Sequence, residues 1–407
     1  MAPTDRRSFL LQTAGALSGI SLLPDPLPTE PVRLVAPQRV GLIGAGRQGR
    51  AIIGELQQLP DVTVGVVCDS NPSRLRTALE RAPGAEGTPD YHAVLGKSDV
   101  DAVIVATPTH LHRQIVQHAI QAGKHFYCEA PLAHTVEDAR AMAQAAANFK
   151  GVAAAGFLAR TNPMYIRAAS FLGSDTLRDP VSCLAQSNRK TSWRFPGADP
   201  AADRAVNWRL DPEVSTGLAG ELGSHQFDVA VWMLNGLPAR ISGRGAIRLH
   251  DDGRIVFDTV GAELVWANGV ALQWSATLAS SYGGQFEVLH YVNAAIRLAW
   301  THAWLFKEVD SPTQGWEVYA TRQQFYNDEG IVLVADATKL AAQGRLKEGA
   351  GLPHPPLHYA LADFFTAATE GKQPATPLAV AARATALGVL ANQAITTGSL
   401  VPVPPDL

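Results

Sequence analysis

The stretch Val40-Gly41-Leu42-Ile43-Gly44-Ala45-Gly46-Arg47-Gln48-Gly49 is a short apolar run followed by three spaced glycines. The apolar run is typical of a buried parallel strand, and a helical pattern continues through Leu56. Between a strand and a helix, the first glycine allows a tight turn, the second lets a pyrophosphate approach the backbone, and the third lets the helix pack on the strand. The motif therefore predicts a dinucleotide site that includes Gly44, Ala45, Gly46, Arg47, Gln48 and Gly49.

A second apolar run, Val62–Cys68, ends directly before Asp69. This residue lies about 20 positions after the third glycine, where a carboxylate can accept a hydrogen bond from the ribose 2′-hydroxyl of NAD. The same carboxylate would repel the 2′-phosphate of NADP. The combination favours NAD, whereas the nearby Ser70 and Arg74 leave some room for NADP.

Strand and helix patterns alternate further along the chain. Strand patterns at Asp101–Ala106, His125–Glu129 and Gly151–Phe157 are separated by helical patterns at 112–122 and at Val136–Ala147. This alternation predicts an α/β fold with a doubly wound parallel sheet, whose ligands bind in a crevice at the carboxyl ends of the strands. The further cofactor contacts expected at that edge are Thr107, Pro108, His112, Glu129, Ala130 and Pro131.

The pattern changes in the second half of the chain. From Pro180 onward, apolar or alternating runs are separated by short turns, and Asn268-Gly269 is a strong hairpin signal. This pattern predicts an α+β domain built on an open, mostly antiparallel sheet. One face of such a sheet is free to pack against another subunit, so we expect a homo-oligomer. The strand-type runs are Val181–Ser187, Ala239–Leu249, Asp258–Trp266, Val270–Leu278 and Gln285–Tyr291.

The glycine-rich segment 217–228 carries a dense set of polar residues. On an α-helix, Glu221, Ser224, His225 and Asp228 would be spaced i, i+3, i+4 and i+7 and would share one face. Carboxylates one turn away can orient an imidazole and raise its basicity, which suits His225 as a proton acceptor for a hydroxyl group. The alternative is a solvated polar face with an ordinary Glu–His pair.

Aromatic and planar polar side chains on either side of this segment suggest a sugar pocket. Such a pocket needs an aromatic face and a few hydrogen-bonding groups, and Tyr165 is a further candidate for proton transfer. The alternative is packing in the core, above all for Trp208. The substrate-side candidates are Arg160, Asn162, Tyr165, Trp193, Asn207, Trp208, Arg209 and Asp228.

The first residues have the pattern of a targeting signal. Arg6-Arg7 precedes an apolar stretch that runs to Leu23. A positive flank before a short apolar region is typical of a secretory signal, and the arginine pair is similar to the bacterial twin-arginine signal, which is a receptor-read address. The prolines that follow argue against the alternative of an ordinary N-terminal helix. We therefore expect residues 1–37 to be a signal and a linker, and the protein to be exported to the periplasm.

Composition argues against several other classes of protein. The 407 residues carry 34 Lys and Arg against 37 Asp and Glu, a net charge of −3, without a long basic run, so nucleic acid is not an expected partner. No stretch offers the roughly 20 uninterrupted apolar residues of a membrane span. The three cysteines, Cys68, Cys128 and Cys183, lie far apart, so neither a disulfide framework nor a metal site is expected.

In this order and spacing, the motifs resemble those of the Gfo/Idh/MocA oxidoreductase family. The resemblance covers residues 38–400. The residues that carry it are the glycine motif, Asp69, Ala106-Thr107-Pro108 with His112, Glu129-Ala130-Pro131, Gly220 through Asp228, and the C-terminal runs Asp363-Phe364-Phe365 and Glu370-Gly371-Lys372.

The resemblance implies a Rossmann domain over residues 38–157 that binds NAD(P), a sheet domain over 158–345 for substrate and oligomer contacts, and C-terminal helices over 346–407 that pack back on the first domain. It also implies hydride transfer between a carbohydrate or polyol ring carbinol and the nicotinamide. The family's proton-handling histidine falls on His225. A cis peptide between Ala130 and Pro131 is expected as well.

Two departures from the family pattern bear on the chemistry. Ala130 stands where the family usually has a lysine that handles protons, and Glu221 stands where an aspartate is usual. Dehydrogenation would then depend on His225 with help from Glu221, Tyr165 or water. A missing lysine and an export signal also resemble a branch of glycosidases that keep NAD bound and oxidise the sugar only transiently. A third alternative is a sugar-binding protein without catalysis.

Overall fold

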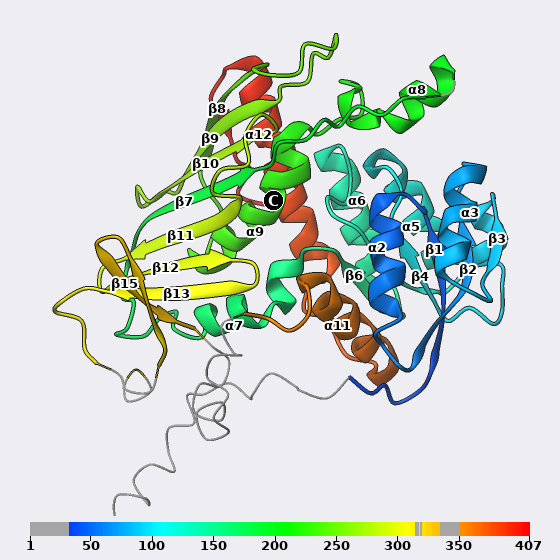
Figure 1. Cartoon of the computed structure of the whole chain (residues 1–407), viewed down its shortest axis with the longest axis horizontal. Coiled ribbons are helices and arrows are strands. Elements are labelled where there is room, and N and C mark those ends of the chain that lie inside the picture. The colour runs from blue at the N-terminus through cyan, green and yellow to red at the C-terminus, as the bar shows by residue number, and fades with distance from the viewer. Residues whose placement is uncertain (1–31, 198, 314–316, 318–319, 334–350) are drawn as a thin grey trace, which may run out of the picture.

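The computed structural model describes residues 32–197, 199–313, 317, 320–333 and 351–407, and in this part of the chain two sheets lie side by side (Figure 1). The first sheet has six parallel strands in the order β3-β2-β1-β4-β5-β6. The order reverses beside β1, which places the ligand edge at the carboxyl ends of β1 and β4. The doubly wound parallel sheet is therefore confirmed. Its strands are β1 Gln38–Ile43, β2 Val62–Cys68, β3 Glu86–Thr88, β4 Ala102–Val105, β5 His125–Cys128 and β6 Ala153–Ala155.

Helices cover both faces of this sheet because its strands are apolar on both sides. Val40 and Leu42 of β1 pack toward α2 and α11, and Val103 and Val105 of β4 pack toward α5, α6 and the start of α12. Asn71 and Thr135 accept backbone hydrogen bonds at the first turns of α3 and α6 and so mark their starts. These helices are α2 Arg47–Leu56, α3 Pro72–Arg81, α4 Tyr91–Leu95, α5 His112–Gln121, α6 Val136–Ala147, α11 Pro356–Glu370 and α12 Leu378–Thr397.

The second sheet has ten strands in the order β14-β15-β13-β12-β11-β7-β10-β9-β8-β16. Only the β7–β10 pair is parallel among the described pairings, so the prediction of an open, mostly antiparallel sheet is confirmed. The strands are β7 Pro180–Asn188, β8 Arg240–Ala246, β9 Thr259–Val265, β10 Ala271–Thr277, β11 Gln285–Tyr291, β12 Ala294–Ala299, β13 His302–Lys307, β14 Arg322–Phe325, β15 Asp328–Val332 and β16 Val401–Pro402.

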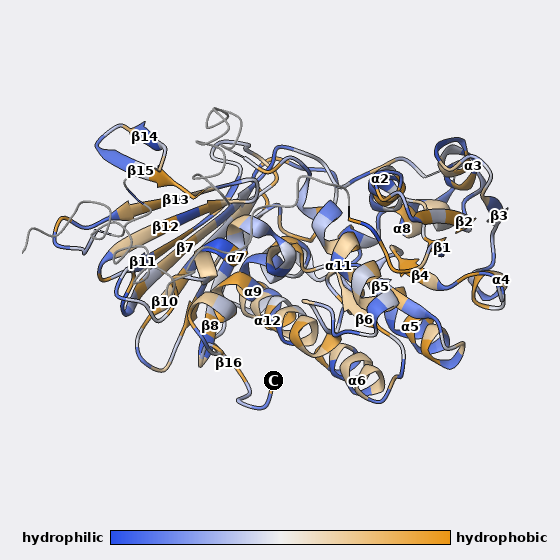
Figure 2. Cartoon of the chain, turned by 90° about the horizontal axis from the view of Figure 1, so that it is seen from below, coloured by the Kyte–Doolittle hydropathy of each residue, from blue (hydrophilic) through white to orange (hydrophobic). Residues whose placement is uncertain are grey.

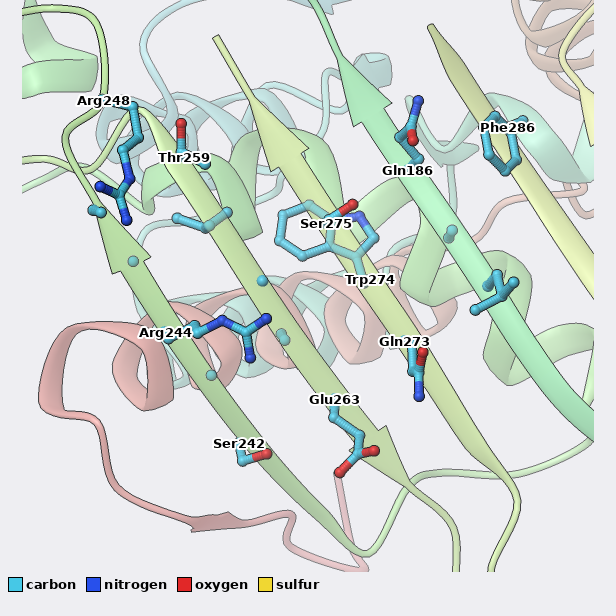
Figure 3. Close-up of a pocket in the computed structure, with 18 residues that line it drawn as sticks. Gln186, Ser242, Arg244, Arg248, Thr259, Glu263, Gln273, Trp274, Ser275 and Phe286 are labelled. Atoms are coloured by element: carbon cyan, nitrogen blue, oxygen red, sulfur yellow. The ribbon is translucent and has the colours of Figure 1, made fainter. Parts of the chain in front are cut away.

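Alternation along these strands separates a core face from an outer face. Leu264 and Leu272 point inward against α9 (Ser224–Met233) and α12, whereas Glu263 and Gln273 point outward (Figure 3). A hollow of about 930 Å³ lies over the outer face. In its described part, the aromatic-rich segment Trp304–Tyr326 supplies most of strand β13 and all of strand β14.

Helix α12 connects the two halves of the molecule. Figure 2 shows α9, α12 and α6 in succession between the two sheets, and α12 contacts α6, α9 and β8. By length and composition alone α12 could cross a membrane, although Arg383, Asn392 and Gln393 interrupt its apolar residues. In the structure, 61% of its most apolar window is buried inside the fold, as is usual for a core helix.

Candidate active site at the junction of the two domains

The glycine turn after β1 has the geometry that its three roles require. Gly44 has a φ of +100°, and a Cβ atom there would lie 2.5 Å from the carbonyl oxygen of Ala106. A Cβ atom on Gly49 would overlap the carbonyl oxygen of Gly44. A Cβ atom on Gly46 would meet nothing within 4 Å, so this glycine faces open space at the start of α2. A pyrophosphate fits there, against the helix N-terminus.

Asp69 lies at the end of β2 beside this turn. Its Oδ2 accepts a hydrogen bond from the backbone N–H of Ala45 at 2.8 Å, and its Oδ1 accepts one from the backbone N–H of Asn71 at 2.8 Å. The carboxylate is therefore held in place next to the nucleotide loop. Ser70 is exposed, and neither its side chain nor that of Arg74 has a partner among the described residues.

The loops after β4 and β5 are joined through His112. This buried imidazole has its Nε2 2.9 Å from the carbonyl oxygen of Thr107 and its Nδ1 3.2 Å from that of Pro131. Both nitrogens point at backbone carbonyl oxygens, to one of which a neutral ring donates, so His112 lies between the two loops and its nitrogens do not point to a cofactor, in contrast to its expected role. Pro108 lies between Thr107 and η2 (Thr109–Leu111). The peptide between Ala130 and Pro131 is cis, as expected.

Glu129 connects the end of β5 to the glycine turn. Its Oε1 accepts a hydrogen bond from Nε2 of Gln48 at 3.0 Å, and burial raises the pKa of its carboxyl to about 7. Arg47, one residue before Gln48, is largely exposed. The buried part of its side chain lowers the pKa of the guanidinium most, and repulsion by the charges of Arg189 and Arg209 lowers it further. Ala130 is partly buried and offers no proton.

The segment before α9 is not the regular helix that the sequence analysis assumed. Residues Ala219–Gly223 form a π-helical turn, η5, in which hydrogen bonds run from i to i+5. Among the described residues, the hydrogen bonds of Glu221 go to other side chains, so the expected contact between Glu221 and His225 is not formed. Glu221 Oε2 accepts from Nε of Arg209 at 2.6 Å, and its Oε1 accepts from Thr109 Oγ1 at 3.3 Å and from Thr216 Oγ1 at 3.2 Å. Glu221 therefore links the two domains.

His225 lies between the two domains, at the first turn of α9. Its ring centroid is 5.2 Å from that of Phe157, which follows β6, and 6.4 Å from that of Trp300. Part of the side chain reaches the surface, but Nδ1 is buried, and neither nitrogen has a hydrogen-bond partner among the described residues. Burial lowers the pKa of the imidazole to about 4. The predicted rise in basicity from neighbouring carboxylates is therefore wrong.

Several substrate-side candidates are occupied by contacts within the protein. Arg160 forms a bidentate pair with Asp228, at 2.9 Å from Nε to Oδ2 and 2.8 Å from the terminal nitrogen to Oδ1. Asn162 begins α7 (Pro163–Ala169) by accepting from the N–H of Met164. The hydroxyl of the fully buried Tyr165 donates to Glu287 Oε2 at 2.6 Å. These residues form a layer behind His225, and Tyr165 is not placed to exchange protons with a substrate.

The remaining candidates come together at Arg209. Its guanidinium lies 4.2 Å from the ring centroid of Trp208 and 5.8 Å from that of Trp193. Trp208 is almost fully buried and is part of η4 (Trp208–Leu210), whereas Trp193 and Arg209 are partly exposed. Arg209 and Trp193 therefore offer the planar polar group and the aromatic face that a sugar requires.

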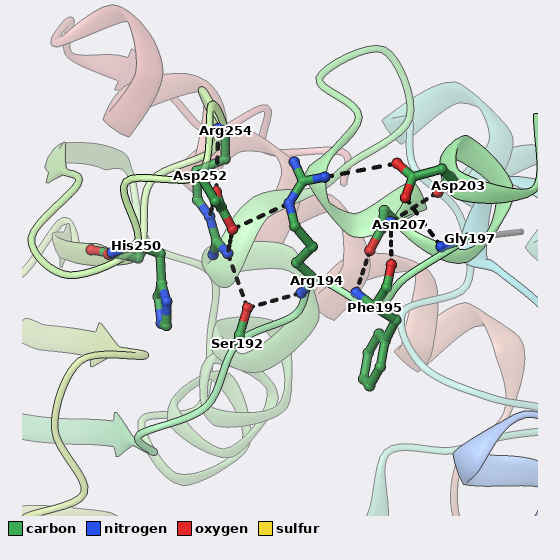
Figure 4. Close-up of polar contacts among 10 residues, drawn as sticks. Ser192, Arg194, Phe195, Gly197, Asp203, Asn207, His250, Asp252 and Arg254 are labelled. Atoms are coloured by element: carbon green, nitrogen blue, oxygen red, sulfur yellow. Dashed lines mark hydrogen bonds and ion pairs between the residues drawn. The ribbon is translucent and has the colours of Figure 1, made fainter. Parts of the chain in front are cut away.

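An arm between β7 and η4 carries Trp193 and the short helix α8 (Pro200–Val206). Asn207 closes the arm by donating to the carbonyl of Phe195 at 2.8 Å and accepting from its N–H at 2.7 Å. Arg194 pairs with Asp252 at 3.2 Å (Figure 4), which anchors the arm on the connection between β8 and β9. Asn207 thus has a structural role.

The sequence analysis did not identify every residue that contributes to this region. Trp300 lies in the turn between β12 and β13, Glu287 lies on β11, and Gln226 donates to Glu287 Oε1 at 2.7 Å. A tryptophan in a two-residue turn was the one visible signal, because glycine or asparagine is usual there. The carboxylate partners come from distant parts of the chain and leave no local pattern.

A nucleotide loop on a Rossmann sheet, facing an unpaired imidazole from a second domain, defines a two-domain, dinucleotide-dependent oxidoreductase. Residues 38–157 match the family model described as an oxidoreductase family with an NAD-binding Rossmann fold, and residues 188–291 match the C-terminal domain of the same family. The chain belongs to the Gfo/Idh/MocA family of oxidoreductases, and its cofactor is NAD.

Curated relatives include sugar and polyol dehydrogenases. The levoglucosan dehydrogenase of Pseudarthrobacter phenanthrenivorans is 28% identical over 204 residues, which are 48% of this chain and 50% of that protein. Inositol 2-dehydrogenase 1 of Saccharopolyspora erythraea is 29% identical over 60% of this chain and 68% of its own length. A glycosyl hydrolase family 109 protein of Shewanella amazonensis is 32% identical over 34% of this chain and 36% of its own length.

Among solved structures, levoglucosan dehydrogenase in complex with NADH and levoglucosan is similar over 90% of this chain and 99% of its own. The TM-score is 0.70 at 23% identity. This similarity supports the two-domain fold. The sequence alignment spans only about half of the curated levoglucosan dehydrogenase.

Proposed function

We propose that this protein is an exported enzyme that holds NAD tightly and transfers a hydride from a carbohydrate ring carbinol, with His225 as the acid/base. The observation that carries the proposal is the position of His225, an imidazole without a hydrogen-bond partner among the described residues, between Phe157 of the NAD-binding domain and Trp300 of the sheet domain. The names of the curated relatives support a sugar or polyol as the substrate.

The lowered pKa of His225 keeps its imidazole neutral at ordinary pH, so a ring nitrogen is available to accept the hydroxyl proton. Bound NAD would supply the hydride acceptor, held by the glycine turn, Asp69 and Glu129. Burial is the one cause of the lowered pKa, and no carboxylate of the described residues counteracts it, so a cationic imidazolium would be poorly stabilised there. We expect the accepted proton to pass on to water rather than to stay on His225.

The Arg209–Glu221 pair would serve the site indirectly. Glu221 holds Arg209 at 2.6 Å and also binds Thr109 of the loop after β4. Arg209 is thereby fixed beside Trp193, where both can contact a sugar. This arrangement supports Glu221 as a positioning residue rather than as a proton carrier.

Purified, NAD-loaded protein tests the proposal directly when it is incubated with a panel of sugars, polyols and glycosides. A ketosugar that accumulates together with NADH is the expected result. His225→Asn should reduce turnover by about 10²–10⁴-fold, the usual contribution of a general acid/base, without loss of bound NAD. His290→Asn is the matched control, because His290 contacts Ser182 on the second sheet. Full activity of His225→Asn would remove this residue from the mechanism.

Ala130 favours a second candidate, an NAD-assisted glycoside hydrolase or lyase. A redox-neutral cycle of oxidation, elimination, water addition and reduction needs no exchange of NAD, which suits an exported enzyme. The similarity to the glycosyl hydrolase family 109 protein is consistent with it. Release of the aglycone with NAD unchanged at the end would favour this candidate, and sugar binding without any product would indicate a binding protein.

Export by the twin-arginine route is part of the proposal and rests on Arg6-Arg7 and the apolar stretch after them. This segment lies outside the described residues. Replacement of both arginines by lysine should retain the protein in the bacterial cytoplasm, as measured by fractionation, whereas unchanged export would exclude this route.

We also propose that the outer face of the second sheet is the subunit interface. Leu184 of β7, which is 41% exposed, lines the hollow on this face. Polar residues of neighbouring strands, such as Arg244, Glu263 and Gln273, lie beside it (Figure 3). Light scattering after size exclusion should show an oligomer that Leu184→Asp weakens. An unchanged mass would place the interface elsewhere or exclude an oligomer.

A further inference from the structure

Trp300 has a backbone conformation that large side chains rarely adopt. It lies with Thr301 in the two-residue turn between β12 and β13, where Ala299 pairs with His302, and its φ is +57°. Glycine or asparagine usually occupies a positive φ in such a turn, because a side chain there is strained. Strain of this kind persists where the surroundings hold it, and it is often found at functional sites.

The protein holds this residue firmly in place. Asn162 Nδ2 donates to the carbonyl oxygen of Trp300 at 2.6 Å. The ring of Tyr165 lies 5.5 Å from the indole between centroids, and Tyr165 is itself fixed by its 2.6 Å hydrogen bond to Glu287. The layer of residues behind His225 therefore determines where the indole lies.

The indole faces the proposed proton acceptor. The rings of Trp300 and His225 are 6.4 Å apart and meet edge to face at 74°. Trp300 Nε1 and His225 Nδ1 are both buried without a hydrogen-bond partner among the described residues. A buried donor without an acceptor is unfavourable, and a ligand oxygen that reaches it would remove this penalty.

We propose that Trp300 is a specificity-determining residue that binds the sugar beside His225. This inference rests on the proposed function and names a substrate contact for it. The Nε1–H of the indole donates to the hydroxyl next to the reacting carbinol. Sugars that lack this hydroxyl, or carry it in the opposite configuration, are then discriminated against, because the donor stays unpaired.

The test compares Trp300→Phe with wild-type enzyme, both loaded with NAD, on the best sugar of the panel and on its monodeoxy analogues. Phenylalanine keeps a six-membered aromatic ring and removes the pyrrole ring with its N–H donor. We expect an about tenfold higher KM with kcat within about threefold, the size of one buried hydrogen bond. The increase in KM on substitution should vanish for the one deoxy analogue that lacks the hydroxyl bound by Nε1, as a double-mutant cycle requires.

Trp304→Phe is the matched control. Trp304 lies on the same hairpin, but its Nε1 donates to Gln323 Oε1 at 3.0 Å, and its ring stacks on His302. The KM of the Trp304→Phe variant should equal that of the wild type.

Trp300→Gly provides a second test if the phenylalanine variant folds poorly, because glycine accepts the positive φ. It should lose about 100-fold in sugar affinity by calorimetry and keep its NAD. Wild-type KM and affinity in both Trp300 variants would overturn the inference. A wild-type enzyme that binds no sugar would overturn the proposed function instead, and the inference with it.

Discussion

The two sides of the site differ in how their polar groups are satisfied. On the cofactor side, Asp69 accepts two backbone hydrogen bonds and Glu129 accepts one from Gln48. On the substrate side, the nitrogens of His225 and the indole N–H of Trp300 have no partner in the part of the chain that the structure describes. The protein thus fixes the two carboxylates of the cofactor side by its own hydrogen bonds and leaves the ring nitrogens of His225 and Trp300 to be completed by a ligand.

This difference matches two binding tasks. A cofactor that must stay bound profits from a site fixed in advance, since little further ordering is needed on binding. A substrate that must be recognised and released profits from groups that become paired only when the correct hydroxyls arrive. Substitutions on the two sides should therefore fail in different ways.

The largest effect is expected at Gly49 on the cofactor side. Gly49→Ala places a Cβ atom into the carbonyl oxygen of Gly44, so the turn must open, and NAD affinity should fall more than 100-fold together with thermal stability. Gly46→Ala is the control, because a Cβ atom there meets no protein atom. This variant should keep its melting temperature and lose only NAD affinity, as measured by calorimetry. Equal melting temperatures for both variants would contradict the assigned roles.

A smaller effect is expected at Glu221, which connects the two sides. Glu221→Ala removes the partner of Arg209 and the bond to Thr109. Because the Arg209 side chain is 42% exposed, water can replace part of the lost interaction, and we expect a loss of about 1–2 kcal/mol in urea unfolding. KM for the sugar should rise more than the dissociation constant of NAD, whereas an equal change in both would contradict a positioning role on the substrate side.

A pH-dependent effect of similar size is expected at Glu287 behind Trp300. Burial raises the pKa of this carboxyl to about 7 in the folded protein, above its ordinary value of 4.5. The folded state therefore binds the proton more tightly, and this contribution to stability is lost as the pH rises from about 4.5 to about 7. Urea unfolding at several pH values should show a decline on the order of 2 kcal/mol, which Glu287→Gln removes. If the free energy of unfolding of the variant declines with pH as it does in the wild type, the decline belongs to another group, such as Glu129.

The sequence predicted the cofactor side well because its signals are local. The glycines, Asp69 and the apolar strand runs each follow from backbone requirements within a few residues, and the structure has the predicted parallel sheet. The substrate side was predicted less well. Residues Ala219–Gly223 form a π-helical turn, which a period of 3.6 residues cannot reveal, and Glu221 binds Arg209 and Thr109 instead of His225. The pairs Arg160–Asp228 and Tyr165–Glu287 join distant segments of the chain. The sequence therefore assigned Arg160, Tyr165 and Asp228 to the substrate instead of to their partners within the protein.

The π-helical turn packs against Gly388 of α12, where an added Cβ atom would lie 3.0 Å from the Cα of Gly220 and 3.1 Å from the carbonyl oxygen of Ala219. The same helix lies against α6 of the NAD-binding domain. The position of His225 relative to the NAD-binding domain is thus set by α12, a helix that begins more than 150 residues downstream of His225. A chimera that exchanges the sheet domain between relatives should keep the activity of its parents only if α12 comes from the same parent as His225.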